Sequence, residues 1–270
     1  MEKNEQRVWE GVADDFFSEI GNESLVETPP AAAEKASIAE HRQILDILFL
    51  IDVSGSMRGQ RIAQVNYALE NIFKELRKRD ELNSTIKIGI MEFADEAKWI
   101  TEQPVPLEDY VFTQINTQPW VTNYGKAFSL LNEKLRREGF LDPRMGEYFA
   151  PLILFITDGE PVDVTEYPED LRKLKGNGWF KKSSKYAIAV GEEAKNEEIG
   201  LLLSEFTGVR ENVRYADEGE SLCNLIEFIT IRASEVQTSM LSDSSDKKEN
   251  DQSLFDSPDA SLFSSMYNDQ

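Results

Sequence analysis

The sequence has a single cysteine, Cys223, and a single histidine, His41, among its 270 residues. One cysteine cannot form a disulfide within the chain, and it lacks the paired spacing of a zinc site. Cys223 falls in an apolar stretch, where we expect a small buried side chain. His41 stands alone before the first predicted strand. A Ser-His-Asp or Cys-His catalytic arrangement would therefore have to take its base from the edge of the fold.

Positive charge and long hydrophobic runs are also scarce. Acidic residues outnumber basic ones by 50 to 29, which gives a formal net charge of -21. A chain this acidic is repelled by nucleic acid and by anionic membranes, so neither is expected as a partner. No apolar run approaches the roughly 20 residues that span a bilayer, and the polar N-terminus does not resemble a signal peptide. The sequence predicts a cytoplasmic protein.

The composition changes twice along the chain and divides it into three zones. Residues 1–43 carry ten acids and four bases and are expected to form a flexible acidic segment. Residues 233–270 carry eight acids and two bases and are dense in Ser and Asp. We expect this tail to be disordered, because it cannot bury enough apolar surface to offset chain entropy. Residues 44–232 hold nearly all of the periodic apolar pattern, enough for one large α/β domain.

Within the middle zone the apolar pattern alternates between two periods. Continuous apolar runs or strict alternation predict strands at 44–51, 85–93, 152–156, 186–190 and 212–215, with a short edge strand at 98–101. Helical spacing predicts helices at 62–76, 124–138, 197–206 and 221–232. Strands separated by helices indicate right-handed crossovers. The predicted fold class is α/β, with a mostly parallel central sheet, one short antiparallel edge strand, and helices on both faces.

Oxygen-bearing side chains follow two of these strands and precede the second helix. Asp52, Ser54 and Ser56 come after the first strand, Asp158 follows the strand that ends at residue 156, and Thr122 precedes the helix. Sheets of this kind bind ligands beyond the carboxyl ends of their strands, so we expect these five side chains to meet. Hydroxyl and carboxylate oxygens suit a hard cation such as Mg²⁺. Mostly neutral ligands would leave the cation able to accept a carboxylate from a partner.

The same residues stand in motifs of a known family. Asp52-Val-Ser-Gly-Ser56 resembles the DxSxS part of a metal-ion-dependent adhesion site (MIDAS). Thr122-Asn-Tyr-Gly-Lys-Ala127 and Thr157-Asp-Gly159 resemble two further segments of the von Willebrand factor A (vWA) family, in the family's order. The resemblance covers residues 44–232. It implies a Rossmann-like fold, a Mg²⁺ or Mn²⁺ ion held by the five side chains, and binding of an acidic residue of a protein partner without catalysis.

Two longer segments, 51–59 and 154–163, resemble the bacterial tellurium-resistance-associated TerY-type branch of the family. That resemblance implies a stress-response assembly with kinase-like or phosphatase-like partners. One departure concerns Trp120-Val121-Thr122, where many family members have Gly-Gly-Thr. The bulky pair either shifts Thr122 or places an aromatic wall beside the metal. Thr117 is the alternative ligand, although no Gly-X-Ala helix start follows it.

Other polar and aromatic residues near these motifs have two interpretations each. Three side chains are candidates for contact with a partner: Trp120, Tyr124 and Arg58. The acidic residues Glu160 and Asp163 are expected to be solvated loop residues. The basic stretch 172–185, which contains two aromatic residues, is expected to be a solvated surface segment whose aromatics pack on the sheet.

Two other functions remain open. A metal-dependent phosphoesterase could use Asp52 and Asp158 together with the metal. No general base is evident near them, so an enzyme is not expected. A scaffold could instead act through its tails, where Phe16-Phe17, Leu254-Phe255 and Leu262-Phe263 stand among acidic residues like short linear motifs. The leading hypothesis is a metal-dependent protein-interaction module.

Overall fold

The computed structural model describes residues 43–78, 84–216 and 220–239. The predictions for residues 1–42 and for the tail from residue 240 onward lie outside the described residues. In the described part of the chain, no helix combines the length and the apolarity needed to cross a membrane.

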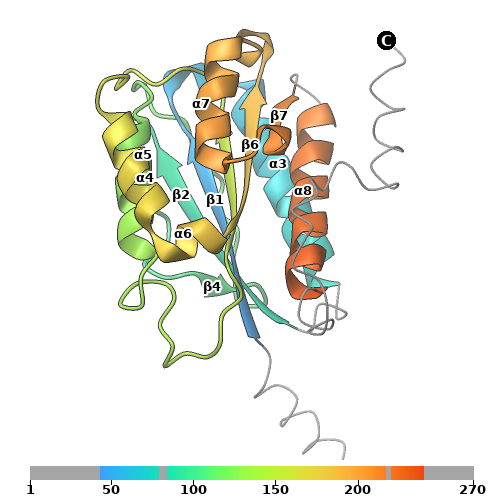
Figure 1. Ribbon diagram of the computed structural model, residues 1–270. Coiled ribbons are helices and arrows are strands. Elements are labelled where there is room, and N and C mark those ends of the chain that lie inside the picture. Colours follow the sequence, from blue (N-terminus) through green and yellow to red (C-terminus); the bar gives the residue numbers. More distant parts are fainter. Residues whose placement is uncertain (1–42, 79–83, 217–219, 240–270) are drawn as a thin grey trace, which may run out of the picture. The chain divides into compact units, whose positions relative to one another are not determined.

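Strand β1 (Gln43–Asp52) lies at the centre of a seven-stranded sheet (Figure 1). It pairs in parallel with β2 (Ser84–Phe93) on one side and with β5 (Leu152–Thr157) on the other. Beyond β5 the parallel sheet continues with β6 (Ser184–Val190) and β7 (Val213–Ala216). A central parallel strand is covered on both faces, which explains the continuous apolar run in β1.

Two short strands pair antiparallel with β2 at the other edge of the sheet: β3 (Ala97–Trp99) and β4 (Val105–Pro106). The strand order is β3-β2-β1-β5-β6-β7, with β4 attached to β2. The predicted fold class, a mostly parallel α/β sheet with an antiparallel edge strand, is confirmed. Strand β4 is an addition, because a two-residue strand that contains a proline carries no periodic pattern.

Helices cover both faces of the sheet (Figure 1). On one face, β1 packs against α3 (Gln60–Arg77) and α8 (Glu220–Ser239). The opposite face packs against α4 (Tyr124–Lys134), α5 (Tyr167–Gly176), α6 (Gly178–Lys182) and α7 (Glu197–Thr207). Three 3-10 turns complete the described elements: η1 (Gly55–Met57), η2 (Glu192–Ala194) and η3 (Arg210–Asn212). The two hydrophobic cores therefore lie on either side of one sheet.

Three helical segments differ from the sequence prediction. Helix α4 ends at Lys134 instead of residue 138. Helix α8 runs to Ser239 and buries Ala233 and Ser234, so the domain boundary drawn at residue 233 falls inside it. The basic stretch 172–185, for which no helix was predicted, contains the end of α5 and all of α6, while its Phe180 is buried in the core and its Trp179 packs against it, as expected of these aromatics.

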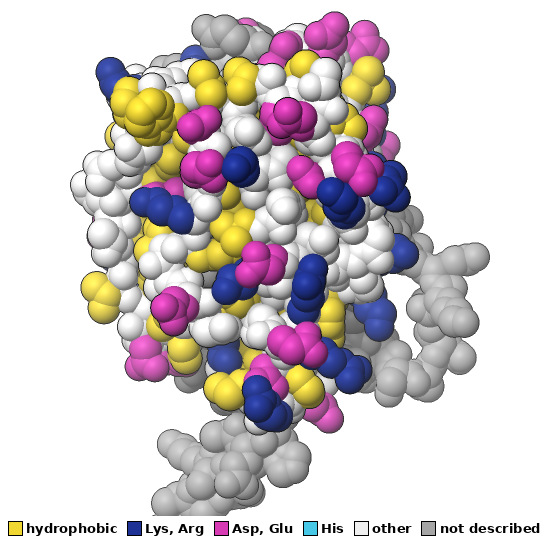
Figure 2. All heavy atoms as spheres, turned by 90° about the vertical axis from the view of Figure 1, so that its left-hand side faces the viewer, with side chains coloured by type: hydrophobic (Ala, Val, Ile, Leu, Met, Phe, Trp, Pro, Cys, Tyr) yellow, Lys and Arg dark blue, Asp and Glu magenta, His cyan; other side chains and the backbone are white. Residues whose placement is uncertain are grey.

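Acidic and basic side chains are interspersed over the face of the molecule shown in Figure 2. The ten acids and four bases of residues 1–43, with the eight acids and two bases of residues 233–270, contribute -12 to the net charge of -21. The middle zone therefore carries only -9. Most of the excess negative charge belongs to the two ends of the chain and not to the folded sheet.

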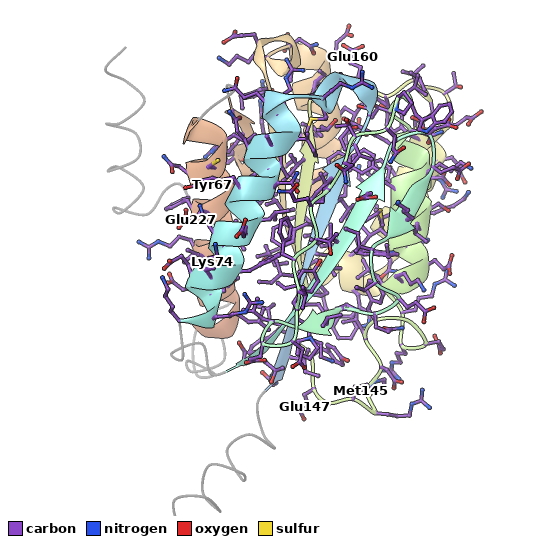
Figure 3. All side chains as sticks on the ribbon, turned by 180° about the vertical axis from the view of Figure 1, so that it is seen from behind. Tyr67, Lys74, Met145, Glu147, Glu160 and Glu227 are labelled. Atoms are coloured by element: carbon purple, nitrogen blue, oxygen red, sulfur yellow. The ribbon has the colours of Figure 1, made fainter. Side chains whose placement is uncertain are left out.

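The strand order reverses at β1. The chain passes from β1 to β2 and later returns to the other side of β1 at β5. In open α/β sheets, the carboxyl ends of the strands at such a reversal are where ligands bind. Asp52 ends β1 and Thr157 ends β5. In Figure 3, Glu160 marks this end of the sheet, and Met145 and Glu147 mark the opposite end.

The acidic residue Asp46 lies inside the sheet, away from the carboxyl ends of the strands. Asp46 of β1 is 1% exposed, and its carboxylate oxygens accept no hydrogen bond from any described residue. Its sheet partner in β2 is Lys87. Burial raises the pKa of Asp46 to about 7, although the positive charge of Lys87 opposes the shift. The carboxyl group is therefore neutral in acid and becomes a buried charge above neutral pH.

We expect Asp46→Asn to stabilise the metal-free protein at alkaline pH relative to wild type. The pKa of Asp46 is about 7 in the folded protein, against 3.8 for an unperturbed group. The contribution of the uncharged Asp46 carboxyl group to stability is thus fully present below about pH 4. It is lost as the pH rises through about 7, because the buried group then becomes charged. About three pKa units at ~1.4 kcal/mol each set an upper limit of roughly 4 kcal/mol. Urea denaturation in EDTA should show a difference between variant and wild type that grows from pH 5 to pH 8; a constant difference would contradict the assignment.

Candidate metal site

Three loops meet at the carboxyl ends of β1 and β5. Backbone hydrogen bonds hold them together: Val53 N–H donates to Phe93 O (2.8 Å), Gly55 N–H to Trp120 O (3.0 Å), and Gln118 N–H to Val53 O (2.6 Å). The loop that follows β1 is thereby fixed against the segment that precedes α4. Val162 N–H donates to Thr122 O at 2.8 Å and attaches the loop that follows β5.

Asp52 is the centre of the first group of polar side chains. Its Oδ1 accepts a hydrogen bond from Ser54 N–H at 2.8 Å. Its Oδ2 accepts from the Thr157 hydroxyl at 2.7 Å and from the Thr122 hydroxyl at 3.3 Å. The bulky Trp120-Val121 pair therefore does not carry Thr122 away from Asp52. Thr117, the alternative, makes no such contact with Asp52 among the described hydrogen bonds.

Asp158 anchors a second group, which adjoins the first through Ser54. The Ser54 and Ser56 hydroxyl oxygens lie 3.0 Å apart. The Ser56 hydroxyl donates to Asp158 Oδ1 at 2.8 Å. The structure thus brings all five predicted side chains into one hydrogen-bonded arrangement.

The arrangement opens to solvent at one position. Asp52, Ser54, Thr122 and Asp158 are buried, whereas Ser56 is exposed. A partner would therefore approach an ion bound to the buried oxygens from the side on which Ser56 is exposed.

Burial raises the pKa of Asp52 to about 6. The hydrogen bonds from Ser54 and Thr157 oppose this shift, and the negative charge of Asp158 adds to it. Two carboxylates, Asp52 and Asp158, share a site from which water is largely excluded. Such a site favours a cation, because a buried charge is stable only when it is compensated.

The donor set fits a hard cation. The arrangement offers three hydroxyls and two carboxylates, and oxygen ligands of this kind suit Mg²⁺ and Mn²⁺. Within the described ranges, no group of three or more His, Cys, Asp or Glu side chains is placed to hold a metal ion. A cation here would depend on the hydroxyls of Ser54, Ser56 and Thr122 as well as on carboxylates.

Tyr124 does not contribute to a partner surface, so that prediction is wrong. Its side chain is 0% exposed, and its hydroxyl lies 2.8 Å from the Gly159 carbonyl oxygen and 3.0 Å from the Thr157 hydroxyl. Burial raises its pKa well above the ordinary value. Tyr124 instead braces the loop that carries Asp158. Trp120 is 57% exposed and Arg58 is exposed, so both remain available to a partner.

Asp163 is not the solvated loop residue that the sequence suggests. It is 7% exposed, and its carboxylate accepts hydrogen bonds from the backbone N–H groups of Tyr124 (3.0 Å) and Gly125 (2.7 Å). It therefore caps the start of α4, where a negative charge is stabilising. A Cβ on Gly125 would lie 2.8 Å from Asp163 Oδ2, so this contact requires a glycine. Glu160, in contrast, is exposed as expected.

Two further residues of the site were missed from the sequence. Thr157 donates to Asp52, as described above, and its place at the end of a buried strand was the available signal. Arg61, in the first turn of α3, donates from Nη1 to Asp158 Oδ2 at 2.7 Å. No sequence pattern pointed to Arg61, because the two residues are 97 positions apart.

Comparison with known proteins identifies the family of this chain. Residues 46–227 match the family model of the von Willebrand factor type A domain. Inter alpha-trypsin inhibitor, heavy chain 4 of Mus musculus is 30% identical over 122 residues, 43% of this chain and 12% of that protein. Inter-alpha-trypsin inhibitor heavy chain H6 of Homo sapiens is 27% identical over 190 residues, 66% of this chain and 14% of that protein. The chain thus spans less than a fifth of the length of these relatives.

A solved structure shares the fold. The pilus adhesin SpaC from Lactobacillus rhamnosus GG, in its open conformation, has a TM-score of 0.54 at 11% identity over 73% of this chain and 30% of that one. Since the family model covers well over half of the sequence, and its fold is the one observed, the chain belongs to the von Willebrand factor type A domain family.

Proposed function

We propose that the chain is a metal-dependent protein-binding module. A Mg²⁺ or Mn²⁺ ion is held by Asp52, Ser54, Ser56, Thr122 and Asp158, and it binds an acidic residue of a protein partner. The observation that carries this proposal is the convergence of three separate loops on one oxygen-lined position whose outermost ligand, Ser56, is exposed.

Asp52 and Asp158 each orient different groups of the proposed site. Asp52 orients the Ser54 backbone and the two threonine hydroxyls. Asp158 orients the Ser56 hydroxyl, so that the oxygen lone pairs of that serine remain available to a cation. When bound, the ion supplies an electrophilic centre, because most of its direct ligands are neutral. A carboxylate from outside is the complementary group.

Apolar side chains stand beside this position and supply a contact surface. Four of the large hydrophobic residues exposed in the described ranges flank Thr122 and Asp158 in sequence: Trp120 (57%), Val121 (50%), Val162 (58%) and Val164 (59%). Hydrophobic side chains lie along the upper end of the molecule in Figure 2, the end at which the loops meet. Exposed apolar groups that gather in one place mark interaction sites. We therefore propose that Trp120 packs against the partner and that Arg58 contributes a positive charge.

The resemblance of segments 51–59 and 154–163 to the TerY-type branch supports a more specific context. On that basis we propose a partner within a bacterial stress-response or phosphorylation-linked assembly that includes kinase-like or phosphatase-like proteins. Only the sequence motifs support this part of the proposal.

Two alternatives make different predictions. A metal-dependent phosphoesterase that uses Asp52 and Asp158 would hydrolyse a generic phosphate ester, and Asp158→Ala would abolish this turnover. A scaffold that acts through its tails would lose its partner on deletion of residues 1–42 or 240–270, which leaves β1 and α8 intact, and would be indifferent to metal. The closeness of the Ser54 and Ser56 hydroxyls to each other and to Asp158 supports the binding module over these alternatives.

Metal removal should abolish partner capture. Affinity purification with mass spectrometry, in Mg²⁺ and in EDTA, should recover the partner only with wild type in Mg²⁺ and not with Asp52→Ala. Calorimetry should show Mg²⁺ or Mn²⁺ binding to wild type and at least roughly tenfold weaker binding to Ser56→Ala, because one of about six oxygen ligands is lost. The matched control is Ser129→Ala, on an exposed position of α4. A partner that binds equally well in EDTA would exclude the proposed function.

Trp120→Ala should separate partner binding from metal binding. We expect the metal affinity to stay within about twofold of wild type, since the Trp120 backbone, which binds Gly55, is retained. Affinity for the captured partner should fall about tenfold, as for a truncated aromatic anchor. Val111→Ala, at a position 84% exposed, is the control and should change neither. Unchanged partner affinity in Trp120→Ala would remove this residue from the contact surface.

A further inference from the structure

A positive side chain lies directly on the candidate metal site. Arg61 Nη1 lies 2.7 Å from Asp158 Oδ2, and the two side chains are only 15% and 0% exposed. The same nitrogen is 3.5 Å from the Ser56 carbonyl oxygen. Arg61 therefore contacts two of the residues that carry the proposed ligands, and it does so from the first turn of α3.

The fold leaves room for this guanidinium. Gly191 follows β6 with a φ of 92°, and a Cβ at that position would lie 2.7 Å from Arg61 Nη2. A side chain there would displace the guanidinium or would be strained by the backbone conformation. The start of α3 and the ends of β5 and β6 thus form one enclosure around the Arg61–Asp158 pair.

Both oxygens of Asp158 are engaged in this arrangement. Oδ1 accepts from the Ser56 hydroxyl, and Oδ2 accepts from Arg61. A guanidinium on Oδ2 competes with any cation for that oxygen and repels a cation nearby. With Asp52, Asp158 and Arg61 counted, the local charge is -1 without a divalent ion and +1 with one.

We propose that Arg61 is a resident counter-cation of the metal site. It compensates Asp158 when the metal is absent, lowers the affinity of the site for Mg²⁺ and Mn²⁺, and leaves the loaded site with the net positive charge that attracts a carboxylate. This inference rests on the proposed function, since it assumes that the five oxygen ligands bind a metal. Arg61 tunes the site and is not itself a metal ligand.

A purely structural salt bridge would behave in the opposite way. If Arg61 only held Asp158 in place for the metal, its removal would misplace Asp158 and weaken metal binding. As a counter-cation, its removal strengthens metal binding and destabilises only the metal-free protein, in which Asp158 is left as an uncompensated buried charge. The sign of the change in metal affinity therefore separates the two roles.

The test is calorimetric titration of the full chain with Mg²⁺ and, separately, Mn²⁺. Arg61→Gln should bind metal roughly tenfold more tightly than wild type, because one unit of nearby positive charge is lost. Arg61→Lys should bind about threefold more tightly, because an ammonium keeps the charge without the planar fork of the guanidinium. Thermal unfolding should show a lower midpoint for Arg61→Gln in EDTA and a larger increase on adding Mg²⁺ than wild type shows.

Arg137→Gln is the control, because it removes the same charge from an exposed position to which no role in the site is assigned. Its metal affinity should stay within about twofold of wild type, since exposed charges are screened. Metal affinity of Arg61→Gln that is equal to or weaker than that of wild type overturns the inference and leaves the proposed function intact. If Arg61→Gln does not fold, the direction of the change in Arg61→Lys decides. No metal uptake by wild type overturns both the inference and the proposed function.

Discussion

The burial of the Asp52 carboxylate at the end of the central strand is the constraint on which the site depends. Because β1 is covered on both faces, its last residue is removed from water. A buried carboxylate needs hydrogen-bond donors or a cation. The donors here come from three segments: Ser54 N–H, the Thr157 hydroxyl and the Thr122 hydroxyl. Compensation of one charge therefore brings together the loops that carry all of the proposed ligands.

Most of the fold could be predicted from the sequence, because its sheet is built from long apolar runs. The strands at β1, β2, β5 and β6 were predicted within a few residues, since each is buried on both faces. Helices α5 and α6 were missed for the complementary reason. Their buried side chains are few (Leu171, Leu174 and Phe180), and lysines and arginines surround them. The many charged residues in these two helices mask their apolar periodicity in the sequence, and their buried face becomes clear only from the tertiary packing.

The site could be predicted in part, and its gaps follow from the range of the contacts. Asp52, Ser54 and Ser56 are neighbours in one loop, and the downstream motifs supplied Thr122 and Asp158. Arg61 contacts Asp158 across the fold, and Asp163 caps the helix that follows Thr122; such distant pairs leave no local pattern. The signal against Tyr124 was present: residues 124, 127, 128 and 131 share the helical spacing of a buried face.

A comparison within β1 supports the role proposed for the outer oxygens of the site. Asp46 and Asp52 lie on the same face of the strand, and burial raises the pKa of both carboxyl groups. Asp46 has Lys87 as its sheet partner and no described hydrogen-bond donor, yet the sheet accommodates it. Asp52 has three hydrogen-bond donors and is also stabilised by the Ser54 side chain, and beyond these the Ser56 hydroxyl and Asp158 continue the polar group outward to the surface. Compensation of Asp52 does not require these outer oxygens. Their position is explained if they hold a cation and present it to a partner.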